Sequence, residues 1–169
     1  VYEEWANSAE IKGTQLVFCD LSTPKKPYSE YEYGKDFDAY NDLKHKLIER
    51  GIPENEIAFI HDANTDRTKQ DLFDKINAGA VRVLIGSTEK CGAGTNVQKR
   101  LVAIHHLDAP YRPRDLIQRN GRGIRQGNMN NSIRIYTYAT ERTFDSYSYQ
   151  ILENKQRFIS QVEKGDMTV

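Results

Sequence analysis

The sequence predicts an α/β domain with three layers, in which a mostly parallel sheet is covered by helices on both faces. Short apolar runs of strand length recur along the chain, and segments with apolar residues at helical spacing lie between them. Alternating strands and helices are typical of parallel sheets, because each crossover places a helix on a face of the sheet. The length of 169 residues corresponds to one domain.

The first part of the chain is expected to form a strand, an insertion and a helix. The apolar run QLVFCD (15–20) has the length of a strand. The polar stretch after it predicts a loop or insertion at about residues 23–36. Its tyrosines could stack on bases, but neighbouring acidic residues would repel phosphate, so we favour a packing or interdomain role. A helix that ends at Gly51 is predicted by apolar residues at helical spacing: Phe37, Tyr40, Leu43, Leu47 and Ile48.

Two further strands, with a helix between them, are expected in the middle of the chain. The apolar runs EIAFIH (56–61) and VRVLIGS (81–87) predict the strands. Asp66 is expected to cap the intervening helix, which ends at Gly79. The buried face of this helix is expected to contain Leu72, Phe73 and Ile76.

The last part of the chain predicts two strands and two helices. LVAIHHL (101–107) and IRIYTYA (133–139) predict the strands, and residues 113–120 between them predict a helix. A long helix closes the chain. Its buried stripe is expected to contain Phe144, Tyr147, Ile151, Leu152, Phe158, Ile159 and Val162.

The composition is that of a soluble globular domain, with 38% hydrophobic and 28% charged residues. No apolar run approaches the roughly 20 residues of a membrane-spanning helix, and Glu3, Glu4 and Trp5 interrupt any signal peptide. Cys19 and Cys91 have no metal-binding spacing and are expected to be small buried residues in a reducing compartment. We therefore expect a cytoplasmic protein without a membrane partner.

The formal net charge of zero conceals an asymmetry between the two halves of the chain. Residues 1–81 carry 10 Lys and Arg against 16 Asp and Glu, whereas residues 82–169 carry 14 against 8. The second half is rich in arginine, whose planar guanidinium fits phosphate oxygens. A solvated surface explains any single arginine, but the cluster from Arg112 to Arg125 indicates an anionic ligand.

Ligands of parallel α/β sheets bind at the carboxyl ends of the strands, which directs attention to the segments after each strand. The segment GSTEKCGAGTNV (86–97) carries hydroxyls and glycines that could turn backbone N–H groups towards an anion. It lacks the G-x-x-x-x-G-K-[ST] pattern of a Walker A loop. A tight strand-to-helix turn explains its glycines equally well.

The segment QRNGRGIRQGN (118–128) gives a stronger signal. Arg122 and Arg125 are spaced to share one face of a helical turn. Two arginines directed at one point suit the charge that develops on a polyphosphate during transfer. A surface network of ion pairs is a poorer explanation, because Asp115 is the only carboxylate between residues 109 and 128.

These segments resemble the motifs of superfamily 2 helicases of the Swi/Snf type. QRNGRGIRQGN is similar to motif VI (Q-x-x-G-R-x-x-R), STEKCGAGTNVQ to motif V, and QLVFCDLSTP lies where motif IV belongs. The resemblance covers residues 13–163, with residues 1–12 as a lead-in segment and 164–169 as a tail. The wider pattern resembles the helicase part of adenine-methylase–helicase fusion proteins of phages and bacterial mobile elements.

The resemblance implies a RecA-like (P-loop NTPase-like) domain that is the C-terminal motor lobe of an ATP-dependent DNA helicase or translocase. ATP would lie in the cleft between this domain and an N-terminal RecA-like lobe of the same protein. That lobe would hold the phosphates and the Mg²⁺ ion. DNA would be bound through its backbone, without sequence preference. The chain alone is therefore expected to be inactive.

On the nucleotide side, the resemblance assigns roles to residues of motifs V and VI. Arg125 corresponds to the arginine finger on the γ-phosphate, Arg122 to a second phosphate-facing arginine, and Gln118 to a residue that supports them. Three residues would face the nucleotide: Gly92, Gly94 and Asn96.

On the nucleic-acid side, the resemblance implies that Ser87 and Thr88 either face the nucleic-acid backbone or couple it to the ATP cleft. Three further phosphate contacts are expected at strand ends: Thr23, Asn64 and Thr65. The Swi/Snf-type motif usually has an acid in place of Gly121 and a histidine in place of Ile124, so the resemblance implies a motor but not chromatin remodelling.

The alternative function is a catalytically inactive nucleic-acid- or protein-binding module derived from a helicase lobe. The intact motif V and VI residues argue against it.

The two adjacent histidines are not expected to bind a metal. His105 and His106 lack acids or cysteines at metal-ligand spacing, so we expect them to pack and form hydrogen bonds, and we expect no metal site.

Overall fold

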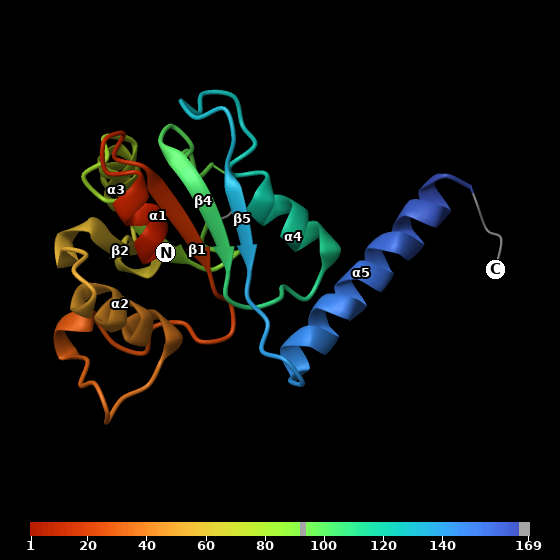
Figure 1. The fold of residues 1–169 in the computed structure, drawn as a ribbon, viewed down its shortest axis with the longest axis horizontal. Coiled ribbons are helices and arrows are strands. Elements are labelled where there is room, and N and C mark those ends of the chain that lie inside the picture. The colour runs from red at the N-terminus through yellow and green to blue at the C-terminus, as the bar shows by residue number, and fades with distance from the viewer. Residues whose placement is uncertain (92–93, 166–169) are drawn as a thin grey trace.

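The computed structural model describes residues 1–91 and 94–165, which form a parallel sheet covered on both faces (Figure 1). The five strands are arranged in the order β2-β3-β1-β4-β5, and every neighbouring pair is parallel. Their bounds are β1 (Thr14–Phe18), β2 (Ile57–Phe59), β3 (Val83–Gly86), β4 (Leu101–His106) and β5 (Arg134–Thr137). All five predicted strands are thus present, each shorter than the apolar run that predicted it.

The helices divide between the two faces of the sheet. The described helices are α1 (Tyr2–Asn7), α2 (Ala39–Glu49), α3 (Asp66–Asn77), α4 (Pro113–Asn120) and α5 (Phe144–Glu163). Short 3-10 turns occupy Tyr28–Glu30, Glu54–Glu56 and Ile60–Asp62. Residues of α1 and α2 share one buried cluster with the sheet, and residues of α3 share the other. The three-layer α/β architecture predicted from the sequence is therefore confirmed.

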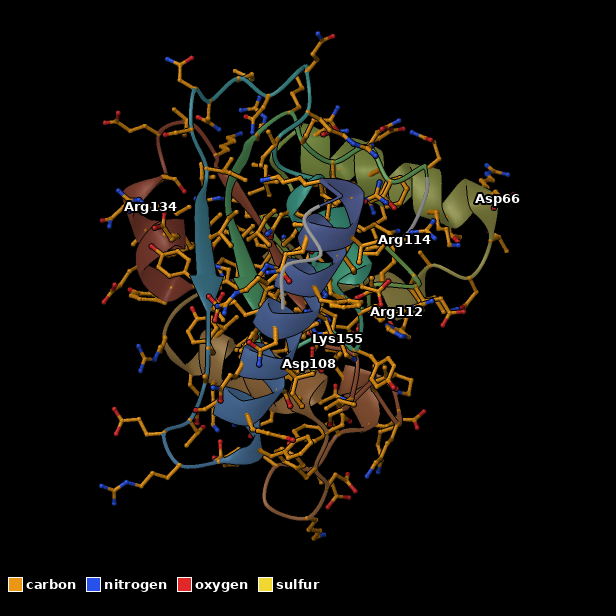
Figure 2. All side chains as sticks on the ribbon, turned by 90° about the vertical axis from the view of Figure 1, so that its right-hand side faces the viewer. Asp66, Asp108, Arg112, Arg114, Arg134 and Lys155 are labelled. Atoms are coloured by element: carbon orange, nitrogen blue, oxygen red, sulfur yellow. The ribbon has the colours of Figure 1, made fainter. Side chains whose placement is uncertain are left out.

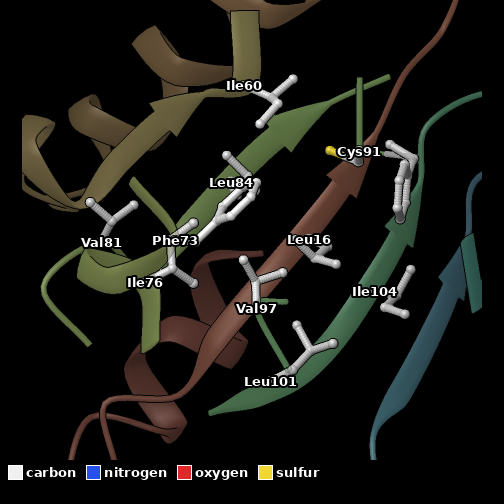
Figure 3. Close-up of a cluster of buried hydrophobic side chains, with 11 residues drawn as sticks. Leu16, Ile60, Phe73, Ile76, Val81, Leu84, Cys91, Val97, Leu101 and Ile104 are labelled. Carbon is white, nitrogen blue, oxygen red and sulfur yellow. The ribbon is translucent and has the colours of Figure 1, made fainter. Parts of the chain in front are cut away.

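Two hydrophobic cores lie on opposite faces of the sheet. The core beneath α3 joins Phe73 and Ile76 to Leu16, Leu84 and Ile104 of the three central strands (Figure 3). Side chains alternate between the faces along each strand, so the intervening residues of the same strands belong to the core beneath α2. Cys19 and Cys91 are buried, as expected.

The N-terminal segment, which was expected to be a lead-in, packs against the sheet. Trp5 Nε1 donates a hydrogen bond to Glu56 at 2.6 Å, and Arg82 Nη2 donates to the Trp5 carbonyl at 2.6 Å. Glu4, which is buried, accepts a hydrogen bond from Arg134 of the edge strand β5 at 2.8 Å. Helix α1 is thereby fixed to three separate parts of the fold.

The insertion at residues 23–36 folds onto helix α2. The Tyr33 ring stacks on His45 with ring centroids 4.3 Å apart, and Lys44 Nζ lies 4.8 Å from the centre of the Tyr28 ring. Half-buried Tyr28 and its neighbours therefore contribute to packing, which agrees with the role favoured from the sequence.

The prediction that Asp66 caps helix α3 is wrong by one residue. Thr65 is the N-cap: its hydroxyl accepts from the Thr68 backbone N–H at 3.2 Å, and the Thr68 hydroxyl accepts from the Thr65 N–H at 3.0 Å. A threonine pair at this spacing forms a capping box without the acidic residue usually sought in the sequence.

The predicted buried stripe of α5 is also largely wrong. Only Leu152 of the stripe is buried, whereas Phe144 and Phe158 are 76% and 66% exposed. Helix α5 contacts α4 and then extends away from the sheet (Figure 1), so most of its apolar residues lie beyond the body of the domain. The spacing predicts a stripe but cannot show how far the neighbouring layer reaches. No helix of the described part is long and apolar enough to cross a membrane.

The buried His105 predicts that the free energy of unfolding depends on pH. Its ring donates to Gln15 Oε1 at 2.7 Å and accepts from the Tyr138 hydroxyl at 2.8 Å, and burial lowers the pKa of His105 to about 3. Between about pH 6.5 and pH 3 the unfolded chain binds a proton at this position that the folded chain does not bind. The free energy of unfolding should therefore fall with decreasing pH, by up to about 1.4 kcal/mol per pH unit from this group.

Urea unfolding of the wild type and of His105→Gln at pH 7 and pH 5 measures this contribution. The variant should be less stable at pH 7 and lose less stability on acidification. Equal losses for the two proteins would show that His105 does not carry the dependence.

Candidate functional site

A groove of about 440 Å³ lies where strands β1 and β3 end, and α4 forms one of its sides. It brings together four of the predicted site residues, Thr23, Ser87, Thr88 and Gln118, from three separate segments. The other lining residues are Asp20, His61, Glu89, Lys90, Arg112 and Asp115. This edge of the sheet is where the parallel architecture predicts a ligand.

The floor of the groove is organised by Arg119, a residue that the sequence analysis did not single out. Its side chain is fully buried, and Nη2 pairs with Asp20 at 2.8 Å and with Asp108 at 3.1 Å. Its Nε donates to the Thr88 hydroxyl at 2.8 Å. The sequence does contain a signal for this network, because Asp20 and Asp108 each come shortly after a strand. Their role becomes clear only in the fold, where Arg119 of α4 lies between them.

The Thr88 hydroxyl is committed within this network. It accepts from Arg119 Nε and lies 2.8 Å from Asp20 Oδ2. A carboxylate can only accept, so the hydroxyl proton is donated to Asp20. Thr88 therefore has no proton left for a phosphate. The Ser87 hydroxyl accepts from the Lys90 backbone N–H at 3.2 Å and keeps its proton available.

Basic side chains stand at the rim beside the groove. Arg112 and Arg114 project from the start of α4, with Lys155 of α5 next to them (Figure 2). Lys155 Nζ lies 4.4 Å from the centre of the Tyr111 ring, and that ring is 83% exposed. Exposed cations at this edge suit a phosphate backbone, because such contacts depend on charge and not on base identity.

The two predicted phosphate-facing arginines lie outside the groove. Arg122 is 4% exposed, and its Nη1 is buried with no hydrogen-bond partner among residues 1–91 and 94–165. Burial and the neighbouring Arg125 both lower the pKa of Arg122. In the described part of the chain neither arginine has a carboxylate partner within ion-pair distance.

This arrangement fits an anionic ligand. A buried guanidinium nitrogen without a partner is costly, and two adjacent cations repel each other. Arg125 Nη1 reaches Asn96 Oδ1 at 3.3 Å and the Thr95 carbonyl at 3.4 Å, so motifs V and VI meet here. An anion with several oxygens would satisfy Arg122 and Arg125 together.

Gly123 has a packing role. A Cβ at this position would lie 2.1 Å from Ile133 Cδ1 and 3.2 Å from Ile104 Cδ1. The glycine therefore allows the arginine-bearing turn to lie directly against the sheet.

Comparisons with known proteins identify the family and the fold. Residues 15–127 match the family model described as the helicase conserved C-terminal domain. The chain belongs to this family. In a solved structure titled as the C-terminal part of the Fun30 ATPase domain, the matching region covers 89% of this chain and 43% of that chain, with a TM-score of 0.63 and 16% identity. This similarity confirms the RecA-like fold of the helicase C-terminal domain.

A curated relative is the Defense against restriction protein B of Escherichia phage P1. It is 35% identical over 83 residues, which are 49% of this chain and 4% of that protein. The helicase C-terminal domain thus corresponds to a small part of this much longer protein.

The remaining predicted residues of the helicase C-terminal domain are distributed around these two regions. Gln118 lines the groove and forms no hydrogen bond with either arginine in the described part. Asn64 and Thr65 are exposed at the start of α3 and do not line the groove. Gly94 is exposed and has a φ of +88°, a left-handed conformation that favours glycine. Gly92 lies outside the described residues.

Proposed function

We propose that this helicase C-terminal domain is the C-terminal motor lobe of an ATP-dependent DNA helicase or translocase. The observation that carries the proposal is the arginine pair: Arg122 is buried with an unpartnered nitrogen, and Arg125 lies against motif V without a carboxylate partner in the described part. This arrangement leaves two cations in need of an anion, and the helicase family supplies a polyphosphate as the candidate.

The nucleotide side of the lobe provides charge and orientation. ATP with Mg²⁺, bound to an N-terminal RecA-like lobe of the same protein, supplies the phosphoryl group that is transferred to water. Arg125 donates to the γ-phosphate as charge develops during transfer, and Arg122 stabilises the same group from its buried position. Asn96 holds the ribose, and the backbone at Gly94 allows the nucleotide to approach closely.

The nucleic-acid side of the lobe is the groove at the carboxyl edge of the sheet. Ser87 donates its hydroxyl proton to a DNA phosphate, while Lys90 and Arg112 supply positive charge at the rim. Thr23 and Gln118 complete the polar lining. Asn64 and Thr65 extend the contacts along the backbone. Such binding weakens with salt and is blind to sequence.

The wider setting is inferred from one relative and from the sequence pattern. The matched phage protein is named for defence against restriction, and the sequence pattern resembles methylase–helicase fusions. We infer that this lobe belongs to a large bacterial or phage protein with a DNA methylase part, acting in the cytoplasm on foreign or mobile DNA.

Hydrolysis of ATP by the intact protein, with and without DNA, tests the proposal. A motor should hydrolyse ATP faster when DNA is added. An inactive binding module would bind DNA without turnover, and the sequence upstream of this domain would then lack a phosphate-binding loop and its acidic pair.

A further inference from the structure

We propose that Arg119 is a positioning residue that couples the nucleic-acid groove to the phosphate-facing arginines. The inference rests on the proposed function and adds to it a residue that touches neither ligand. Arg119 lies in α4, three positions before Arg122, and its side chain reaches the floor of the groove. The Arg122 backbone N–H donates to the Arg119 carbonyl at 3.2 Å, so the backbone at the end of α4 and the Arg119 side chain together connect both regions of the lobe.

The hydrogen bonds of Arg119 show that it cannot bind a ligand directly. A guanidinium has five N–H donors. The two bonds from Nη1 go to the Asp108 carbonyl at 2.8 Å and to His106 Nδ1 at 3.3 Å. With Nη2 on Asp20 and Asp108 and Nε on Thr88, all five donors are used. The side chain is fully buried, so its function is to hold its neighbours.

The partners of Arg119 lie at the carboxyl ends of three different strands. Asp20 follows β1, Thr88 follows β3, and Asp108 follows β4. Asp108 also accepts from the backbone N–H groups of Asp20 and Leu21 at 2.7 and 2.8 Å, which fixes the loop after β1. Movement of α4 therefore shifts the strand ends that line the groove.

The network also decides where DNA phosphates bind. Two aspartates surround one guanidinium, which leaves a formal charge of −1 beneath the groove. Phosphates are repelled from this floor and bind to other residues that line the groove, among them Ser87, Lys90 and Arg112. When ATP draws Arg122 and Arg125 towards the other lobe, α4 transmits the displacement to the groove through Arg119.

Lysine cannot replace Arg119 in this role. A lysine keeps the charge but has three donors and no planar fork, so it leaves at least two of the five acceptors unsatisfied. Arg119→Lys therefore keeps the positive charge and removes the planar set of hydrogen-bond donors. Thr88→Val removes the hydroxyl that Arg119 holds, and Thr88→Ser retains it.

The test is a double-mutant cycle on the intact two-lobe protein, with duplex DNA and ATP as the probes. Arg119→Lys and Thr88→Val should each raise the DNA concentration for half-maximal stimulation by about tenfold, the loss expected of one charge-assisted hydrogen bond. The unstimulated hydrolysis rate and the KM for ATP should change less than twofold. The double variant should need no more DNA for half-maximal stimulation than Arg119→Lys alone. Thr88→Ser, which keeps the hydroxyl, should need about as much DNA as the unaltered protein.

A matched control is Arg50→Lys, which alters an exposed arginine at the end of α2 on the opposite layer and should leave every parameter unchanged. The proposal is overturned if the double variant raises the DNA concentration for half-maximal stimulation by the product of the two single-variant effects. It is also overturned if all hydrolysis rates fall in proportion to the folded fraction of the protein. It is overturned equally if Thr88→Val has no effect. If the unaltered protein shows no DNA-stimulated hydrolysis, the proposed function itself fails, an outcome distinct from all of these.

Discussion

Arg125→Ala is expected to abolish ATP hydrolysis by the intact two-lobe protein, lowering kcat by about 10³-fold or more, while DNA affinity changes less than threefold. An arginine finger contributes on this scale because it meets charge that develops only during phosphoryl transfer. Arg125 lies against Asn96 and away from the groove, so its loss removes no contact to DNA. Steady-state hydrolysis and DNA binding by fluorescence anisotropy at one salt concentration measure both quantities.

Two companion variants make this result specific. Arg125→Lys keeps the positive charge but loses the planar fork, and should recover only a small part of the rate. Arg50→Ala removes an exposed arginine from the opposite layer and should leave hydrolysis intact. Equal losses of hydrolysis and DNA binding in Arg125→Ala would contradict the finger assignment.

Phe18→Ala is expected to cause the largest loss of stability. Phe18 is 1% exposed on the central strand β1, its ring stacks on His106 with centroids 6.0 Å apart, and the Arg119 guanidinium lies 5.3 Å above it. Removing a buried phenylalanine costs about 3–5 kcal/mol, a large share of the roughly 5–15 kcal/mol that stabilises a domain. The variant should be largely unfolded or have a strongly lowered urea midpoint.

Phe37→Ala is the matched control for this loss. Phe37 is 64% exposed before α2, so the same chemical change should alter the free energy of unfolding by less than about 0.5 kcal/mol. Circular dichroism during urea titration compares the two variants. Similar urea midpoints would contradict the placement of Phe18 beneath Arg119.

The central sheet could be predicted because its strands are short apolar runs bounded by turn residues. Helices α2, α3 and α4 followed from spacing and from stop signals such as Gly51 and Gly79. Helix α1 was not predicted, because its contacts through Trp5 and Glu4 are made by residues far away in the sequence. The α5 stripe failed for a related reason, since burial depends on how far the neighbouring layer extends.

The candidate site shows the same division between local and distant information. The sequence indicated the arginine pair and the hydroxyl-bearing segment, because each is a compact motif. It did not reveal that Arg119, Asp20 and Asp108 form one network from three segments. Nor did it show that this network takes up the proton of Thr88, a residue expected to contact DNA.

The proposal that this chain is one lobe of a two-lobe motor is tested most directly by ATP hydrolysis. It is measured in parallel for the intact two-lobe protein and for this 169-residue chain, each with and without DNA. The account predicts DNA-stimulated turnover by the intact protein and none by the lone chain, because Arg122 and Arg125 have no phosphate to act on without the other lobe. Robust turnover by the lone chain would contradict it.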